Sequence, residues 1–518
     1  MRRVMVVAVA AALVATFAPL GRSDEAVLKL VRATPRNQTE ASYLMSYFDE
    51  THNHYDGEIE ILAWPGDLAQ LDASGIDYRV VVEDYVAYAS EPTAAPAPIR
   101  LPGPDRADYR HLADYNAEME KLAKKNKGLV KLFKMKRPSL EGRPVYGVEI
   151  AHNVDAKDGR PTFYIDGIHH AREWPASEYA MVFIHDLVER FGKDPKVTSL
   201  LKKARVIAVP IVNVDGFDYS RESLAQNSIL GAGNGFEGYW RKNRRSLTGV
   251  TAPIPGKPTN PDGYGVDPNR NYAYLWGDSN GGSSGNLLDQ TYRGAEPFSE
   301  PETQNVRDII LGRPVTGVLT LHTYQGSVLR TGGGEAPDDG DLERIGQKVA
   351  DILGYKNAPT VGYPTTGTTD DWAYAAMGAY GYTIENGVIG FHPPYADEVG
   401  AYWKQHNAAF QLLLAMAADE RYHSVIRGTA PCAKSVTVLK SFKTELSPGN
   451  PTGENTFPEK LKVTIATERN GSFEFHVGPS TRPYEKKIEF YTLKTSTGST
   501  TKVAVDRGEA VNVGSLCG

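Results

Sequence analysis

Apolar runs rich in β-branched and aromatic residues alternate with helical patterns through the middle of this chain. The runs lie at 143–151, 161–167, 204–216, 315–324 and 380–387. A helical pattern, "ASEYAMVFIHDLVERFG", separates the second run from the third. Strands that alternate with helices favour a sheet that is covered by helices on both faces. We therefore expect an α/β domain over residues 106–424.

The segments on either side of this domain have different patterns. Strand-like and helix-like stretches are interleaved over residues 25–88, which predicts a small α+β domain. The next segment, 89–105, is rich in Pro and Ala and is typical of an extended linker. Short alternating strands separated by turn clusters occupy residues 430–518 and predict an all-β sandwich or jelly-roll module.

The first 24 residues are typical of a secretory signal peptide. Arg2 and Arg3 precede an apolar run over 4–17, which is short for a membrane span. We therefore expect a secreted, extracellular protein without stable membrane association. A net charge of −6 and a pI near 6.1 favour no nucleic-acid partner. The domain at 25–88 then has two interpretations, a propeptide or a permanent accessory domain.

The chain has two cysteines, Cys432 and Cys517, both in the C-terminal module. In an exported protein such a pair predicts a disulfide. Because no cysteine precedes them, the main body contains neither a cysteine nucleophile nor a thiolate metal site.

Four polar residues, His169, His170, Arg172 and Glu173, follow the second apolar run. A histidine and a glutamate three positions apart on a turn can present a nitrogen and a carboxylate to one cation. Catalytic zinc takes three protein ligands of these types and keeps a fourth position for water. His322 can be the third ligand, because strand ends of an open α/β sheet converge. His169 stays an alternative to His170, as a ligand or as a support for one.

The stretch "GIHHAREW" resembles the signature of the zinc carboxypeptidases, the carboxypeptidase A/B group, and in particular the secreted bacterial carboxypeptidase T-like type. Further stretches similar to this family stand in the family's order: "EGRPVYGVEIA", "VNVDGF", "YWRKNRR", "GVDPNRNY", "YRGAEPFSEPET", "LTLHTY" and "TVGYPTTGTTDDWAYAAMGAYGYTIEN". The resemblance spans about residues 108–418. It implies a mixed, eight-stranded sheet flanked by helices, one zinc ion per chain, and hydrolysis of C-terminal peptide bonds.

The resemblance also implies a role for each matching residue. The implied zinc ligands are His170, Glu173 and His322. The implied catalytic residues are Glu385, as general base, and Arg241, which polarises the scissile carbonyl. The implied substrate-binding residues are Arg172, Asn269, Arg270, Tyr363 and Asp370. The arginine among these residues fits the implied activity. A planar guanidinium binds a carboxylate with two hydrogen bonds, so it selects a substrate's free C-terminus.

Asp370 stands where the family forms the floor of the pocket for the C-terminal side chain. A carboxylate there pairs with Lys or Arg, so we expect a basic or mixed basic and apolar preference. The chain departs from the family at Val214, which replaces a proline. It also departs in the lengthened loops before Arg241 and Asn269.

Two other functions compete with this interpretation. One is a zinc amidohydrolase or peptidase that acts on cell-wall peptides, and Arg270 with Tyr363 argues against it because both serve a free terminal carboxylate. The other is a non-catalytic binding protein on the same scaffold, which requires the loss of a ligand or of the base. We expect a monomer whose partners are peptide C-termini and a protease that removes the propeptide.

Overall fold

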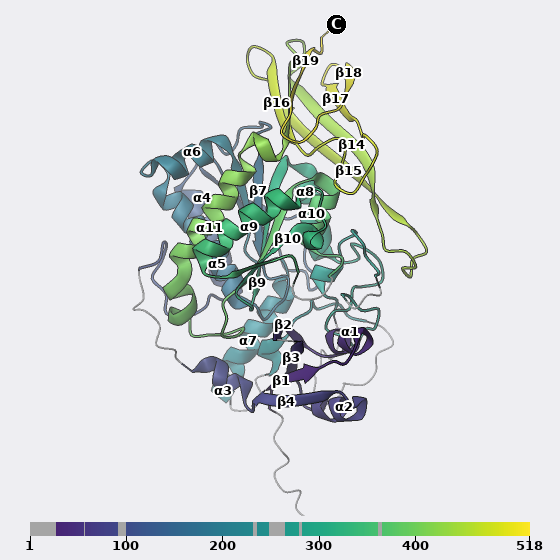
Figure 1. The fold of residues 1–518 in the computed structure, drawn as a ribbon. Helices are drawn as coiled ribbons and strands as arrows, with labels where there is room; N and C mark the ends of the chain where they lie inside the picture. Colours follow the sequence, from purple (N-terminus) through teal and green to yellow (C-terminus); the bar gives the residue numbers. More distant parts are fainter. Residues whose placement is uncertain are drawn as a thin grey trace, which may run out of the picture.

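The computed structural model describes residues 27–55, 57–91, 100–230, 236–247, 265–278, 282–360 and 365–517. The expected signal peptide, residues 92–99 of the Pro/Ala-rich linker and Tyr363 lie outside the described residues. Three regions follow one another along the chain in Figure 1: an N-terminal sheet in purple, a central body in blue to green, and C-terminal strands in light green to yellow. No helix of the described residues has the length and apolar character needed to cross a membrane.

The central body is built on one sheet, whose strands are β5 (Val130–Lys134), β6 (Tyr146–Ile150), β7 (Thr162–Gly167), β8 (Arg205–Val209), β9 (Val315–Thr323), β10 (Ser327–Arg330), β11 (Lys356–Ala358) and β12 (Tyr380–Asn386). Their spatial order is β11-β10-β12-β9-β7-β8-β6-β5, which makes the sheet eight-stranded. The run β12-β9-β7-β8 is parallel, whereas β5·β6, β6·β8 and β10·β12 are antiparallel. The predicted mixed α/β fold is confirmed.

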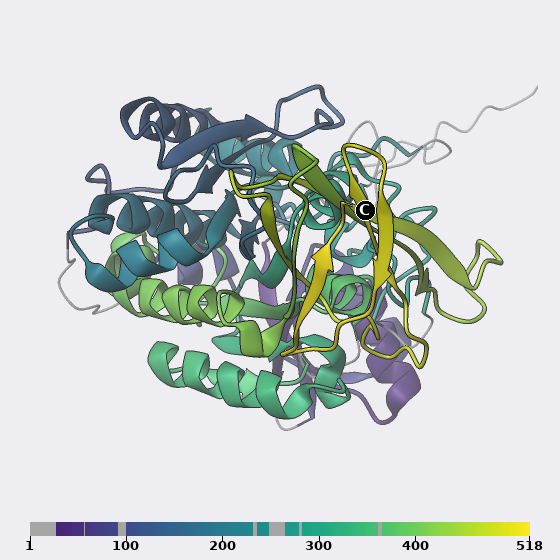
Figure 2. The same ribbon diagram turned by 90° about the horizontal axis from the view of Figure 1, so that it is seen from above.

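The four central strands are covered on both faces. Every residue of β7, β8, β9 and β12 is buried, as in other parallel sheets with helices on either side. Helices α5 (Trp174–Arg190) and α11 (Ala401–Ala417) contact β7 and β9, while α4 (Leu112–Lys125) contacts β5 and β6. Figure 2 shows helices on both sides of the sheet. The other helices of this body are α6 (Pro195–Lys203), α7 (Val214–Leu230), α8 (Pro301–Gly312), α9 (Asp339–Leu353) and α10 (Thr369–Met377).

The N-terminal residues form a separate antiparallel sheet in the order β2-β3-β1-β4. Its elements are β1 (Lys29–Thr34), α1 (Gln38–Tyr47), β2 (Glu50–Tyr55), β3 (Glu58–Ala63), α2 (Asp67–Ser74), β4 (Asp77–Val82) and α3 (Tyr85–Ser90). Trp64 and Tyr85 share a buried apolar cluster with Tyr324 and Phe391 of the central body. Because Tyr324 directly follows β9, this N-terminal unit covers the carboxyl end of the central sheet.

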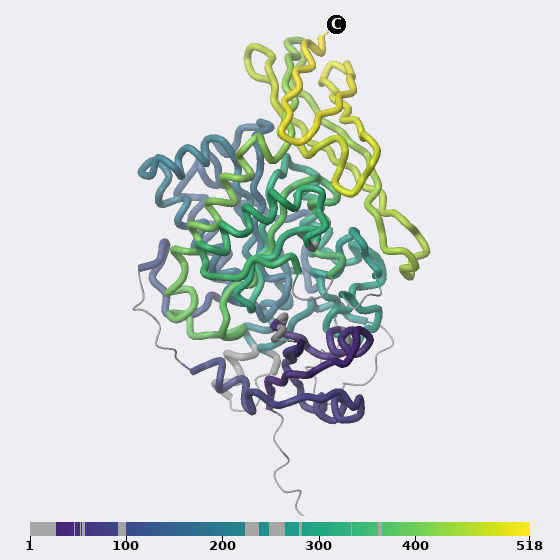
Figure 3. The backbone as a smooth tube through the Cα atoms, viewed as in Figure 1, coloured from purple at the N-terminus to yellow at the C-terminus, as the bar shows by residue number. Residues whose placement is uncertain are grey.

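The C-terminal residues form two further sheets, ordered β16-β13-β19 and β15-β14-β17-β18. The strands are β13 (Ser424–Thr429), β14 (Ser435–Glu445), β15 (Thr456–Ala466), β16 (Ser472–Val477), β17 (Tyr491–Thr495), β18 (Thr500–Val503) and β19 (Ala510–Ser515). Burial alternates along β14 and along most of β15, as in strands with one face in a core. Figure 3 shows the C-terminal strands and the N-terminal unit at opposite ends of the molecule.

The predicted disulfide between Cys432 and Cys517 is present, and it closes a loop whose ends are 85 residues apart. A cross-link of this span stabilises a fold by about 4 kcal/mol on the loop-entropy model, because it restricts the unfolded chain. We predict that the double variant Cys432→Ser/Cys517→Ser unfolds its C-terminal strands at lower urea concentration than the parent, as measured by pulse proteolysis. Dithiothreitol should lower the parent's midpoint and leave the double variant's unchanged. Equal midpoints for parent and variant would contradict the prediction.

Candidate functional site

Three parallel strands bring the expected site residues to one edge of the sheet. β7 ends at Gly167 and leads into His169 and His170, β9 carries His322 near its end, and β12 carries Glu385. The register of β9 and β12 places Glu385 directly beside His322. Residues from positions far apart in the chain therefore meet because the strands that carry them end together.

The turn between β7 and α5 sets the direction of the first two expected ligands. Ile168 has φ +54°, in the left-handed region that β-branched residues rarely adopt, so the chain turns sharply after the strand. Glu173 is the N-cap of α5, and Pro175 in the first turn suits the start of a helix. His170 and Glu173 thus lie on one short, rigid segment.

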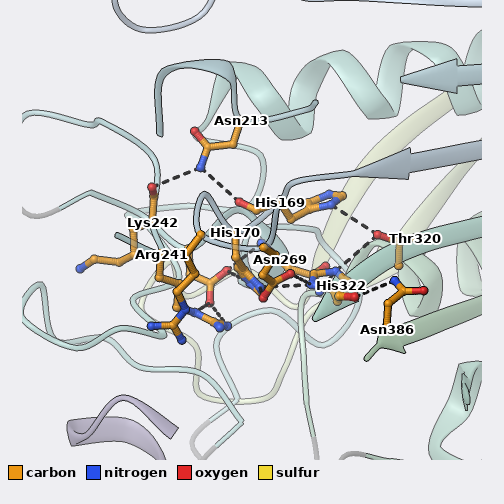
Figure 4. A network of polar contacts seen from close by, with 12 residues as sticks. His169, His170, Asn213, Arg241, Lys242, Asn269, Thr320, His322 and Asn386 are labelled. Carbon is orange, nitrogen blue, oxygen red and sulfur yellow. Dashed lines mark hydrogen bonds and ion pairs between the residues drawn. The ribbon is translucent and has the colours of Figure 1, made fainter. Parts of the chain in front are cut away.

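His170, Glu173 and His322 form a compact buried cluster. His170 Nδ1 lies 2.7 Å from Glu173 Oε1, and His322 Nδ1 lies 2.9 Å from Glu173 Oε2. The two Nδ1 atoms are 3.1 Å apart. All ligand atoms of the cluster lie within 4.8 Å of one another. Figure 4 shows His170 and His322 converging beside Arg241 and Asn269.

The electrostatics of this cluster fit a cation. Two imidazole nitrogens at this separation repel each other unless a proton or a cation lies between them. Burial lowers the pKa of His170 to about 4. For His322, the Glu173 carboxylate outweighs burial and raises the pKa to about 9. Two imidazoles and one carboxylate are also the donor set of many catalytic zinc sites. The cluster can therefore hold a metal ion.

Asp267 connects this cluster to Arg241, and it was not singled out from the sequence. Its Oδ1 lies 3.1 Å from His170 Nε2, and its Oδ2 accepts a hydrogen bond of 2.9 Å from Arg241. Burial alone would raise the pKa of Asp267, but Arg241 and His170 hold it well below its usual range. A carboxylate on the outer nitrogen of a metal-binding histidine fixes the ring orientation. The sequence did offer a signal for it, because Asp267 stands two residues before Asn269 in the stretch "DPNRN", which was already assigned to the site.

A cavity of about 410 Å³ opens beside the cluster. Among its lining residues are six that the sequence predicts for the site: His170, Asn269, Arg270, His322, Asp370 and Glu385. Arg270 is buried, and its guanidinium donates to the backbone oxygens of Gly282 and Asn269 at 2.7 and 2.9 Å. Asn269 lies next to the cluster, with its side-chain nitrogen 3.3 Å from His322 Nε2.

Arg241, Arg172 and His169 lie outside both the ligand cluster and the cavity lining, and Arg241 is held by Asp267 as described above. Arg172 is fully buried outside the cavity lining, where it pairs with Asp49 of the N-terminal unit at 2.8 Å and lies 4.1 Å above the Phe391 ring. Sequence reasoning missed Asp49, because no local pattern marks it. His169, the alternative ligand, is 2.9 Å from both Tyr272 Oη and Thr369 Oγ1 and is not part of the ligand cluster.

Comparisons with known proteins agree with the geometry. The family model Peptidase_M14, described as zinc carboxypeptidase, matches residues 115–409. Carboxypeptidase A2 of Rattus norvegicus is 28% identical over 335 residues, which cover 61% of this chain and 72% of that protein. Carboxypeptidase B of Homo sapiens is 27% identical over 300 residues, or 55% of this chain and 65% of that protein. The chain thus spans about two thirds of the length of these relatives.

Solved structures show the same fold. Carboxypeptidase A from Helicoverpa armigera has a TM-score of 0.57 and 21% identity, covering 76% of this chain and 98% of that one. Thrombin activatable fibrinolysis inhibitor has a TM-score of 0.56 and 21% identity, covering 76% and 99%. The family match extends over more than half of the sequence and includes all three residues of the cluster, His170, Glu173 and His322. The chain belongs to the zinc carboxypeptidase family.

Proposed function

We propose that this protein is a secreted zinc-dependent carboxypeptidase that removes single residues from the C-termini of peptides and proteins. The observation that carries the proposal is the cavity that His170, His322, Glu385 and Arg270 share. A metal-binding cluster beside a carboxylate suits hydrolysis, and a buried guanidinium in the same cavity suits a free terminal carboxylate. Secretion is supported by the apolar N-terminal stretch and by the disulfide, which forms in oxidising compartments.

His170, Glu173 and His322 are the proposed zinc ligands. The ion, when bound, supplies Lewis acidity to water and to the scissile carbonyl. Asp267 orients the His170 ring through its Nε2 atom, 3.1 Å away. Because Asp267 also receives hydrogen bonds from Arg241, one buried carboxylate positions both a ligand and the guanidinium that we propose stabilises the developing oxyanion.

Glu385 is the proposed general base. It lines the cavity on the strand next to His322 and is buried. In this position its carboxylate can take a proton from the attacking water and return it to the leaving amine. General acid–base groups of this kind accelerate reactions by about 10²- to 10⁴-fold.

We predict that Glu385→Gln lowers kcat by about 10²- to 10⁴-fold, because the amide cannot accept the proton. The zinc content, measured by mass spectrometry of the metal, should stay at one ion per chain. Glu343→Gln, at an exposed position of α9, is the matched control and should keep parental activity. A chelator should abolish the activity of the parent. Parental activity in Glu385→Gln would instead favour a non-catalytic binding protein.

Arg270 and Asn269 are the proposed binders of the terminal carboxylate, and Tyr363 is proposed to close over it. Two backbone oxygens hold the Arg270 guanidinium in place, and among the residues that the structure describes no carboxylate forms an ion pair with it. A buried cation held by neutral oxygens gains most from an incoming anion, since the anion supplies the missing opposite charge.

We predict that the parent cleaves peptides with a free C-terminus and leaves their amidated forms intact. Arg270→Ala should lower kcat/KM for the free peptides by 30-fold or more, about 2 kcal/mol for a buried charge pair. Arg421→Ala, at an exposed position, is the control and should behave as the parent. If the parent hydrolysed amidated and free peptides equally, the amidohydrolase alternative would replace this proposal.

Asp370 supports a preference for basic C-terminal residues. Its carboxylate lines the cavity and accepts a hydrogen bond of 3.1 Å from the Thr383 hydroxyl. Asp371 lines the same cavity, and burial together with Asp370 raises its pKa to about 7. Asp278 and Glu335 add two further carboxyl groups to the lining. The lysine or arginine side chain of a substrate would be paired there.

The N-terminal unit is proposed to be an inhibitory propeptide. Asp49 reaches the buried Arg172, a residue that we propose contacts substrate, and their ion pair is fully enclosed. Burial alone would raise the pKa of Asp49, but Arg172 lowers it below the ordinary value. The pair's contribution is therefore present above about pH 4 and is lost as the pH falls through the depressed pKa. Two arginines near the end of the linker are candidate points for cleavage by an activating protease. Arg100 is exposed, whereas Arg106 pairs with Asp114 at 3.0 Å.

We predict that cleavage after Arg100 raises peptidase activity at least tenfold, because it lets the N-terminal unit dissociate. Asp49→Asn should raise the activity of the intact chain several-fold, since it leaves Arg172 without its buried partner, and should leave the cleaved enzyme unchanged. Asp77→Asn, an exposed change on β4, is the control for the intact chain. Equal activity of intact and cleaved parent would show that the unit is a permanent accessory domain.

A further inference from the structure

One side chain of the C-terminal module reaches the substrate cavity. Tyr484 lies in the loop between β16 and β17, and it lines the same cavity as Glu385, Asp370 and Asp371. Its ring stacks on that of Tyr274, another lining residue, with centroids 5.3 Å apart and planes inclined by 14°. Two parallel aromatic rings thus form one wall of a cavity whose floor carries carboxylates.

The backbone at Tyr484 has an unusual conformation that the surrounding contacts impose. Tyr484 has φ +67°, a left-handed conformation that a bulky residue rarely adopts. Such strain persists where the surrounding contacts impose it, often at functional sites. The hydroxyl also rests against the chain at Gly332, where an added Cβ would lie 2.3 Å from Tyr484 Oη.

Arg482 anchors the same loop to the helix that carries Asp370. The Arg482 side chain is buried and donates to the backbone oxygen of Ala375 in α10 at 2.9 Å and to that of Lys443 in β14 at 2.9 Å. Glu489 accepts a further bond of 2.7 Å from its Nε atom. The position of Tyr484 relative to α10 is therefore fixed by hydrogen bonds within two residues of it.

Other residues of the module hold α10 itself. Trp372 directly follows Asp371 in the chain, and its Nε1 atom donates to Glu459 of β15 at 3.1 Å. At the other end, Arg507 donates to the backbone oxygen of Gly378 at 2.8 Å. The C-terminal module thus contacts both ends of the helix whose first turn presents Asp370 and Asp371 to the cavity.

We propose that Tyr484 is a specificity-determining residue that forms the distal wall of the pocket for the C-terminal side chain of the substrate. The inference rests on the proposed carboxypeptidase function and assigns the C-terminal module a part in substrate selection. The chemistry of this wall suits arginine and lysine. Their methylene stems pack on an aromatic face, and a desolvated cation over such a face is attracted to it. The carboxylate of Asp370 adds the opposite charge.

The test compares kcat/KM for matched peptides that end in Arg, Lys, Phe or Ala. For Tyr484→Ala we expect a fall of about tenfold on the Arg and Lys peptides, mostly through KM, and a change of less than twofold on the Ala peptide, which does not reach the wall. Tyr484→Phe keeps the aromatic face and should stay within threefold of the parent. Tyr484→Trp fills the distal space and should penalise the Arg peptide more than the Ala peptide. Phe490→Ala, an exposed aromatic change in the same loop region, is the control.

Each outcome separates this inference from the proposed function. An equal loss on Arg and Ala peptides in the Tyr484 variants would make the residue a packing contact alone and overturn the inference. If Tyr484→Ala fails to fold, as judged by thermal unfolding, the Phe and Trp variants decide by the same Arg-to-Ala ratio. A parent that cleaves none of the free peptides would overturn the proposed function, and this inference with it. A parent that is active, with an unchanged ratio in every variant, would overturn only the role of Tyr484.

Discussion

The parallel pairing of β7, β9 and β12 is the constraint on which the site depends. These strands are buried along their whole length, so their polar residues can gather only where the strands end. The register of β9 and β12 sets Glu385 beside His322, and the pairing of β7 with β9 brings His170 to the same edge. A shift of register would separate the proposed ligand His322 from the proposed base Glu385, and the apolar side chains inside the sheet oppose such a shift.

The second constraint is that each buried charge needs a partner of opposite charge. In the site, single carboxylates each serve two partners. Glu173 contacts both histidines of the cluster, and Asp267 contacts both His170 and Arg241. Removing one member of such a network leaves another charge buried and unpaired, which costs about 3–5 kcal/mol. Substitutions at Asp267 would therefore disturb metal binding and the position of Arg241 together, although Asp267 itself does not line the cavity.

The sequence predicted the residues that a local pattern marks, and missed those defined by contacts between distant segments. His170, Glu173, His322 and Glu385 follow or end apolar runs, and the mixed sheet follows from the alternation of those runs with helices. Asp49 and Tyr484 stand in stretches with no distinguishing pattern, and each gains its place only when a separate unit packs against the central body. The sequence also did not show the buried partner of Arg172, because Asp49 stands 123 positions away. The substrate contact that the resemblance implies for Arg172 stays a prediction. Tyr363 lies outside the described residues, so its role stays a prediction.

The two flanking units engage the central body in different ways, and the difference fits the roles proposed for them. The N-terminal unit contacts the central body through an ion pair and an apolar cluster, and it is joined to the rest of the chain through the Pro/Ala-rich stretch 89–105, which contains the exposed Arg100. Cutting that stretch leaves only non-covalent contacts. The C-terminal module accepts a hydrogen bond from Trp372 near the start of α10 and donates one to Gly378 at its end. It has no comparable linker, because β13 begins within seven residues of the end of α11. Removal of the first unit would expose Arg172 and the apolar cluster at the carboxyl end of the sheet, whereas removal of the second would take Tyr484 out of the cavity wall.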